Sequence, residues 1–185
     1  MTETGNITMT DTELTYRAMT VGDIDGLVER LYARFDSSTK DKKRKKYEAY
    51  CSEIRGSKGI AAIATADTEI AGYVTMLREA ASGTPFREEH IPQISDLFVF
   101  EDFRERGVGT GLMDYIERQA ASINNAVCLG VGLTENNGAA QRLFVRRGYI
   151  PDGSGVWYGR QQAGYYTKID DVGSLMLYMS KPLND

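Results

Sequence analysis

The chain has 185 residues and a mass of 20.6 kDa, so we expect one domain over residues 1–185, with a flexible N-terminus over residues 1–13. Its composition, 42% hydrophobic and 26% charged, is typical of a protein with a packed core. The single histidine, His90, argues against zinc sites and histidine-based triads, so we expect no metal. The two cysteines are far apart, and no apolar run approaches the roughly 20 residues that span a membrane. These features favour a cytoplasmic protein.

The formal net charge of −4 hides an uneven distribution. Six of the 22 basic residues lie between Lys40 and Lys46, where the single acid is Asp41, so the rest of the chain is strongly acidic. This argues against a nucleic-acid surface and favours a cationic small molecule as partner. The basic run fits a solvated helix start, which we expect, or a contact to phosphates or acidic lipid. We therefore expect neither nucleic acid nor membrane as a partner.

The first third of the chain alternates between strand and helix patterns. Leu14–Met19 alternates as a strand does, and Asp23–Arg34 places its apolar residues on one helical face. A second helix is expected over about Lys42–Ile54. The apolar runs Gly59–Ala66 and Glu69–Leu77 flank a turn-prone pair of residues and predict a β-hairpin.

The middle of the chain predicts a strand over Gln93–Phe100, then a glycine cluster, then an amphipathic helix. Further strand and helix patterns follow over Ala126–Leu133 and Asn137–Arg147, and Gly148 is placed to end the second helix. The amphipathic helix is expected to bury Leu112, Ile116, Ala120 and Ile123 and to turn Asp114, Glu117 and Arg118 to solvent.

A long glycine- and tyrosine-rich loop is expected from Tyr149 to Gly173, before a last strand over Ser174–Ser180. Long loops in compact domains are often functional. Its aromatic residues fit either a substrate cavity or a cover over the end of the sheet. They are Trp157, Tyr158, Tyr165 and Tyr166.

The stretch Arg104–Gly111 joins the central strand to the amphipathic helix. Free amides at a helix start form a site for a diphosphate, and glycine allows the backbone to approach the phosphate oxygens. The dinucleotide pattern G-x-G-x-x-G does not match, because it needs glycine at Leu112, and the Walker pattern needs a Gly-Lys pair that this chain lacks. A glycine-rich turn without a ligand is the alternative.

This R-x-x-G-x-G pattern after the strand Ile94–Val99 resembles the acetyl-coenzyme A site of the GNAT superfamily of N-acetyltransferases. Asn137–Tyr149 is similar to the second signature of that superfamily, N-x-x-A-x-x-L-Y-x-x-x-G-F/Y. The resemblance is close over about Ile94–Tyr149. It implies an α/β fold with a mixed, mostly antiparallel sheet of six or seven strands and about four helices. The two parallel central strands would splay apart around the cofactor.

The resemblance also implies a binding site for acetyl-CoA. Main-chain groups of the central strand would bind the pantetheine arm, which Asn137 would also face, and amides from Arg106 through Thr110 would hold the diphosphate. The arginines of the motif would add charge, unless they are ordinary surface residues. The implied residues are Leu97, Phe98, Val99, Arg104, Glu105, Arg106, Gly107, Val108, Gly109, Thr110, Gly111, Asn137, Ala140 and Phe144.

The reaction that the resemblance implies is direct attack of an amine on the acetyl thioester, with the oxyanion stabilised by an amide of Phe98 or Val99. An alkylammonium titrates near about pH 10.4, so a base or a water chain must remove its proton. Asp96, beside the thioester, is the expected base. Alternatives near strand ends are Glu88, Glu89, His90 and Glu135.

One departure from the family pattern concerns the leaving group. The position that often carries a tyrosine, proposed to protonate the thiolate, is Phe144 here, so water or another tyrosine would have to serve. Cys128 lies in an apolar strand and is expected to be a packed thiol and not an acylated nucleophile.

Three hypotheses follow for function. The leading one is N-acetylation of a small amine by acetyl-CoA, with protein amines left open as acceptors. The second is a non-catalytic acyl-CoA-binding or regulatory module, and the third is a nucleic-acid or membrane adaptor that uses Lys40–Lys46. The oligomeric state, including a homodimer, is left open.

Overall fold

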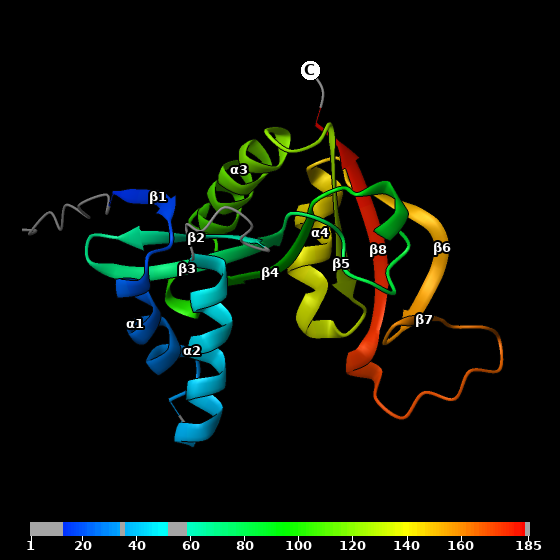
Figure 1. The fold of residues 1–185 in the computed structure, drawn as a ribbon, viewed down its shortest axis with the longest axis horizontal. Coiled ribbons are helices and arrows are strands. Elements are labelled where there is room, and N and C mark those ends of the chain that lie inside the picture. The colour runs from blue at the N-terminus through cyan, green and yellow to red at the C-terminus, as the bar shows by residue number, and fades with distance from the viewer. Residues whose placement is uncertain (1–12, 34–35, 52–58, 184–185) are drawn as a thin grey trace, which may run out of the picture.

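A computed structural model of the chain describes residues 13–33, 36–51 and 59–183. Its strands form one sheet in the order β1-β2-β3-β4-β5-β8-β6-β7 (Figure 1). The expectation of a flexible N-terminus falls outside the described residues except at residue 13, and the predicted ends of the first two helices, at residue 34 and residues 52–54, also lie outside them. The strands are β1 (Leu14–Ala18), β2 (Gly59–Ala66), β3 (Glu69–Leu77), β4 (Gln93–Val99), β5 (Ala126–Gly132), β6 (Ile150–Tyr158), β7 (Gln161–Gln162) and β8 (Leu175–Pro182).

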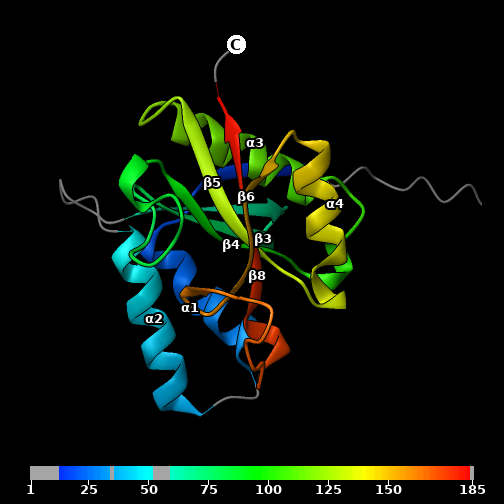
Figure 2. The same cartoon turned by 90° about the vertical axis from the view of Figure 1, so that its right-hand side faces the viewer.

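Helices cover both faces of the first half of the sheet. The helices α1 and α2 lie on one face and α3 on the other (Figures 1 and 2). The helices are α1 (Val21–Leu31), α2 (Ser37–Cys51), α3 (Val108–Ala121) and α4 (Gly138–Arg146), with short 3₁₀ turns η1 (Arg87–Glu89), η2 (Glu101–Phe103), η3 (Glu135–Asn137) and η4 (Val172–Ser174). None of the described helices is long and apolar enough to cross a membrane.

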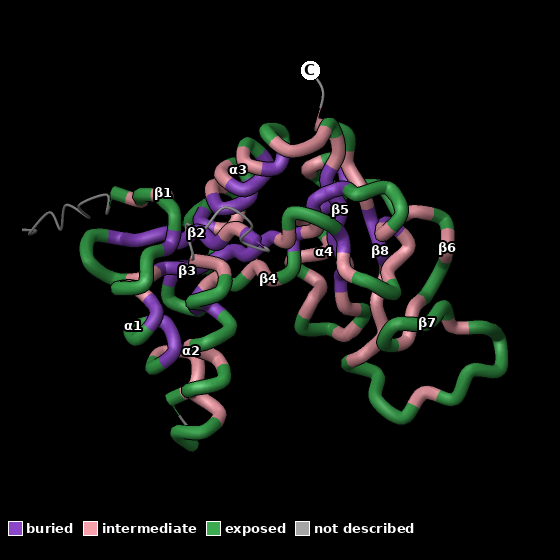
Figure 3. The backbone as a smooth tube through the Cα atoms, viewed as in Figure 1, coloured by how far each residue is buried: buried purple, intermediate pink, exposed green. Residues whose placement is uncertain are grey.

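The predicted hairpin is confirmed as the antiparallel pair β2 and β3. Both strands read as almost continuous apolar runs because helices pack on both of their faces. The core therefore lies between these strands and the helices, where Figure 3 shows the backbone buried. Large side chains buried there include Leu27, Tyr47, Ile63 and Leu112.

The sheet is mixed and mostly antiparallel, as predicted, with β4 and β5 as its parallel pair. It has eight strands and not six or seven, because the expected loop after Tyr149 contains β6 and β7. The pairing of β6 with β8 breaks between Pro151 and Val156, where Gly153 and Gly155 have φ of 85° and 80°. This interruption hides the strand from a search for alternating residues.

The basic run lies in the middle of α2, and three of its six basic residues, Lys40, Arg44 and Lys46, form ion pairs within the described residues. Lys40 and Arg44 both bind Glu29 of α1, at 2.6 and 2.9 Å, and Arg44 also binds Asp25 at 2.7 Å. These ion pairs join the outer sides of α1 and α2. The run is therefore not simply solvated, and one of its lysines, Lys46, reaches the sheet.

The amphipathic face of α3 is confirmed at Leu112, Ile116 and Ala120, which are fully buried. Glu117 was expected to face solvent, and this expectation is wrong, since the residue is only 8% exposed. Its carboxylate is compensated by Arg147, which follows α4, and by Lys181 of β8. These partners are distant in sequence, which is why the helical pattern alone misplaced the residue.

Gly148 ends α4 as predicted. Its φ is 87°, and it donates to the Val145 carbonyl at 3.0 Å. The Tyr149 amide donates to the Phe144 carbonyl at 3.0 Å, and the centres of the two rings lie 5.7 Å apart. This is a Schellman cap with its hydrophobic contact, and it fixes Phe144 relative to the following strand.

Candidate functional site

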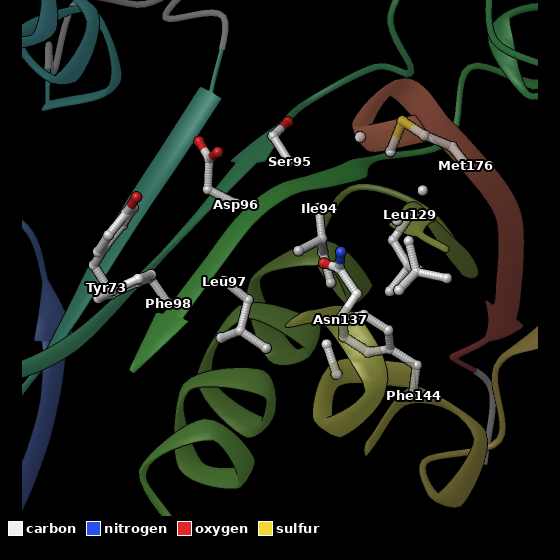
Figure 4. A pocket seen from close by; sticks show the side chains of 15 residues that line it. Tyr73, Ile94, Ser95, Asp96, Leu97, Phe98, Leu129, Asn137, Phe144 and Met176 are labelled. Carbon is white, nitrogen blue, oxygen red and sulfur yellow. The ribbon is translucent and has the colours of Figure 1, made fainter. Parts of the chain in front are cut away.

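The candidate site lies where β4 and β5 separate. The two strands share two residue pairs, Gln93 with Cys128 and Ile94 with Leu129, and then diverge, as the splayed-sheet prediction requires (Figure 1). A pocket of about 340 Å³ occupies the opening. It is lined by Tyr73, Ile94, Ser95, Asp96, Leu97, Phe98, Leu129, Gly130, Val131, Gly132, Asn137, Ala140, Phe144, Gly173 and Met176 (Figure 4).

A β-bulge in β4 accompanies the divergence. Thr75 of β3 pairs with Asp96, but the next residue, Met76, pairs with Ile94, so Ser95 is the extra residue. A bulge bends its strand and increases the local twist. Beyond Ile94, β4 therefore remains paired with β3 but no longer with β5.

Alternate residues of β4 direct their main-chain N–H and C=O groups toward this opening. Phe100 donates its amide to the Ala71 carbonyl at 3.0 Å, and the Phe98 carbonyl lies 2.6 Å from where a Cβ on Gly72 would stand. The main-chain groups of Phe98 thus face β3. Because neighbouring residues of a strand point in opposite directions, Leu97 and Val99 direct theirs toward the opening.

The glycine-rich stretch leaves a run of free amides at the start of α3. Gly107, with φ of 82°, precedes the helix, and the first hydrogen bond runs from the Gly111 amide to the Gly107 carbonyl at 3.0 Å. Within the described residues, the amides from Arg106 through Thr110 meet no acceptor. This is the arrangement in which a helix start binds an anion.

The other two glycines of the stretch differ in how closely they are packed. A Cβ on Gly109 would lie 3.6 Å from Val99 and 3.5 Å from Leu143, so the start of α3 adjoins both the end of β4 and α4. A Cβ on Gly111 would lie 2.1 Å from the Tyr16 ring. With its amide already bonded, Gly111 has a packing role instead of an anion-binding one.

The charged residues of the stretch are exposed and do not line the pocket. Glu105 adopts a φ of 63°, which turns the chain toward the helix. The amide of Arg104 donates to the Glu101 carbonyl at 3.1 Å, and the Arg106 guanidinium lies 5.7 Å from the centre of the Phe103 ring. The arginines are thus placed near the helix start and remain accessible.

Asn137 and Phe144 approach the opening from the side of α4 (Figure 4). The Asn137 Nδ2 donates to the Thr134 hydroxyl at 2.9 Å, and its Oδ1 has no partner within the described residues. A Cβ on Gly132 would lie 2.5 Å from that Nδ2, so the glycine makes room for the amide. Ala140 and the buried Phe144 ring supply an apolar surface below it.

Asp96 lines the pocket on the opposite side of β4 (Figure 4). Its Oδ2 accepts hydrogen bonds from Lys46 at 2.8 Å and Thr75 at 2.9 Å, whereas its Oδ1 has no partner in the described part of the chain. Burial lowers the pKa of Lys46, but the hydrogen bond and the charge of Asp96 outweigh this and hold that pKa above its usual value. The carboxylate is therefore anchored and still offers one free oxygen.

Tyr73 was not among the expected site residues. It lines the pocket beside Asp96, its ring stacks on Phe98 at 6.0 Å, and its hydroxyl accepts a hydrogen bond from Tyr47 at 3.2 Å. Burial, with the charge of Asp96, raises its pKa above the usual value, so it is a neutral phenol. Its strand pattern indicated only a core residue, and the register with Phe98 is what places it here.

The other candidates lie outside this pocket. Glu88, Glu89, His90 and Glu135 belong to or adjoin the turns η1 and η3, and none lines it. Among the aromatic residues of the expected loop, Tyr165 and Tyr166 are fully exposed. Trp157 covers the sheet instead, with its ring 5.4 Å from that of Tyr178.

Two further kinds of chemistry concern the Cys128 thiol and the ligands that a metal ion would need. Cys128 is fully buried, and burial raises the pKa of its thiol to about 12, so it is a packed thiol. Among the described residues, no group of three histidine, cysteine, aspartate or glutamate side chains is placed to hold a metal ion.

The model of the acetyltransferase (GNAT) family matches residues 27–149. The chain belongs to this family. The matched segment includes the strands β2–β5, the glycine-rich stretch and α4, so the expected resemblance is confirmed. A comparison with curated protein sequences finds no significant match.

Several solved structures share the fold of the chain. Arabidopsis thaliana NAA60 in complex with acetyl-CoA has a TM-score of 0.63 and 16% identity, covering 94% of this chain and 100% of that one. Aminoglycoside 6'-acetyltransferase type Ii has a TM-score of 0.64 and 17% identity, covering 92% and 98%. The ribosomal-protein-S18-alanine N-acetyltransferase of Escherichia coli has a TM-score of 0.62 and 15% identity, covering 94% and 96%. At such identities the likeness shows the fold alone.

Proposed function

We propose that this acetyltransferase moves the acetyl group of acetyl-CoA directly to the amine of a small acceptor molecule. One observation carries the proposal: the edge of β4 that lines the pocket ends beside the free amides at the start of α3, where a Cβ on Gly109 would lie 3.6 Å from Val99. Family membership and the acetyl-CoA complex of NAA60 support the choice of acetyl donor.

The residues present fit such a donor. Main-chain groups of Leu97 and Val99 would bind the pantetheine amides as an added strand does, and the free Oδ1 of Asn137 would accept from the same arm. Phe98, with its main chain turned to β3, is less suited to this role. The amides from Arg106 through Thr110 would hold the diphosphate. When bound, acetyl-CoA supplies an activated acetyl thioester.

Asp96 would act as the base. Asp96 lines the pocket with its Oδ1 free within the described residues, while Lys46 and Thr75 hold the other oxygen in place. A carboxylate so oriented can take a proton from the acceptor ammonium directly or through one water. An amide of Leu97 or Val99 would donate to the acetyl oxygen as negative charge develops on it.

The pocket wall at Phe144 lacks a hydroxyl, so this residue gives no proton to the departing sulfur. A thiol with a pKa of about 8.5 leaves as its anion and is protonated by water. The same feature favours the second candidate function, a non-catalytic acyl-CoA-binding module, because such a module needs no acid.

Two measurements decide between these functions. Free thiol release is followed with acetyl-CoA and a panel of amines, including peptides with free N-termini, and acetyl-CoA binding is measured by calorimetry. Transfer predicts binding and release with at least one small amine. Binding without release on any amine indicates the module, release with peptides alone indicates a protein acceptor, and absence of binding overturns both candidate functions.

A further inference from the structure

Lys46 is the one residue of the basic run that contacts a pocket-lining side chain in the described structure. Its Nζ lies 2.8 Å from the Asp96 Oδ2, and the lysine side chain remains 40% exposed. An ammonium group has three N–H donors, and Asp96 takes one of them. Two donors therefore remain for a ligand that reaches this end of the pocket.

The charge at this end of the pocket is a plus–minus pair and not an acidic cluster. Asp96 is the charged residue that lines the pocket, and Lys46 stands directly against it. Lys42 lies one helical turn before Lys46 on the same face of α2 and has no ion pair within the described residues. Asp171, beside the lining residue Gly173, has both oxygens bonded by Gly173 and Ser174.

Such a pair discriminates between kinds of amine. A purely cationic acceptor gains from Asp96 but is repelled by Lys46 at nearly the same distance. An acceptor that carries a carboxylate next to its ammonium meets an opposite charge at both ends. The stacked rings of Tyr73 and Phe98 add an apolar wall beside the pair.

We propose that Lys46 is a specificity-determining residue that binds a carboxylate of the acceptor, and that the acceptor is an α-amino acid or a similar zwitterion. Its ammonium then faces the free Oδ1 of Asp96, the oxygen that would accept the proton. This inference rests on the proposed acetyl transfer and names its acceptor class.

The test compares amino acids with the amines that lack their carboxylate. The probes are phenylalanine with phenethylamine, leucine with isoamylamine, and lysine with cadaverine. We measure kcat/KM for each by thiol release, using the wild type, Lys46→Met, Lys46→Arg and Lys45→Met. Lys45 is the matched control, because it is an exposed neighbour on α2 with no ion pair in the described residues.

The wild type is expected to prefer the amino acid in at least one pair. Lys46→Met lowers kcat/KM for that amino acid about tenfold or more beyond any loss it causes for the paired amine, and this extra loss appears mainly in KM. Lys46→Arg retains the preference for the amino acid, and Lys45→Met matches the wild type. Circular dichroism and acetyl-CoA calorimetry check that each variant is folded.

Three results overturn the inference. The first is a wild type that prefers the amines or accepts neither member of any pair. The second is a Lys46→Met variant that slows both members equally, which would make Lys46 only a positioning residue for Asp96. The third is an equal loss in Lys45→Met. In each case acetyl-CoA binding and release with other amines show whether the proposed transfer itself survives.

Discussion

Glu117 in α3 and Arg147 after α4 form a two-point ion pair, with the arginine Nε 2.9 Å from Oε1 and its Nη2 2.9 Å from Oε2. Lys181 donates to the same carboxylate at 2.7 Å, and the Tyr149 hydroxyl donates at 3.1 Å. One buried carboxylate thus joins α3, the end of α4 and β8.

Glu117→Gln is expected to destabilise the protein by about 3 kcal/mol, because it leaves two cations without their buried partner. Burial raises the pKa of Glu117, but its bonds to Arg147 and Lys181 outweigh this and hold that pKa below the usual value. The stabilisation is therefore complete above about pH 4.5 and is lost as the pH falls through the lower, folded value. Urea unfolding at pH 7 and pH 3 should show the gap from wild type closing in acid.

The exposed Asp114, which also binds Arg147, provides the control for this experiment. Asp114→Asn is expected to cost less than about 1 kcal/mol at pH 7. An equal cost for the two variants would contradict the special role of Glu117.

The free amides of α3 can be tested at Thr110, whose side chain is exposed. Thr110→Pro removes an amide hydrogen that the helix does not use, whereas Thr110→Ala keeps it, and proline is tolerated in a first helical turn. We expect the proline variant to bind acetyl-CoA about 10-fold more weakly than the alanine variant, since one hydrogen bond to a charged group is lost. Calorimetry checks this, and equal affinities would place the diphosphate elsewhere.

The role of Asp96 can be tested with Asp96→Asn. The amide keeps an oxygen for Thr75 and Lys46 but cannot take a proton, so kcat is expected to fall about 100-fold while acetyl-CoA affinity stays unchanged. Ser95→Ala, at the neighbouring bulge residue, should retain most activity. A loss of kcat of less than about threefold in Asp96→Asn would indicate that a water chain or another group takes the proton.

Cys128 is expected to resist alkylation by iodoacetamide in the folded protein, because its thiol is fully buried and its pKa is raised to about 12 by that burial. Cys51, which is partly exposed, is expected to react first. Mass spectrometry of the native and the urea-unfolded chain distinguishes the two sites. Cys128→Ala should retain acetyl transfer, and its inactivation without unfolding would argue for an acyl-enzyme.

Local patterns were sufficient for the parts of the fold that depend on local residues. The apolar runs of β2 and β3, the face of α3 and the glycine that ends α4 each follow from neighbours within a few positions. β6 was not predicted because two glycines interrupt its pairing with β8. Glu117 was misplaced because its partners stand 30 and 64 positions away.

The site residues, too, could be predicted where their placement depends on neighbouring residues and not where it depends on distant ones. The glycine-rich stretch and Asn137 could be located from motifs, because their spacing is local. The direction of the Phe98 main chain depends on the ladder between β3 and β4, and the packing role of Gly111 depends on Tyr16, which lies far away in the chain. Lys46 and Tyr73 reach Asp96 only through the packing of α2 and β3 on β4.

The two-pair junction of β4 and β5 has a mechanical consequence. The strands β1–β4 and the strands β5–β8 form two parts of the sheet that are connected by these two residue pairs alone in the described structure. Past the pairs, the edge of β4 that faces away from β3 has no strand partner among the described residues. A pantetheine chain bound along that edge would connect the two parts of the sheet. Its binding free energy would then add to the free energy of unfolding of the protein. At a ligand concentration 100 times Kd this amounts to about 2.7 kcal/mol, so saturating coenzyme should raise Tm by several degrees.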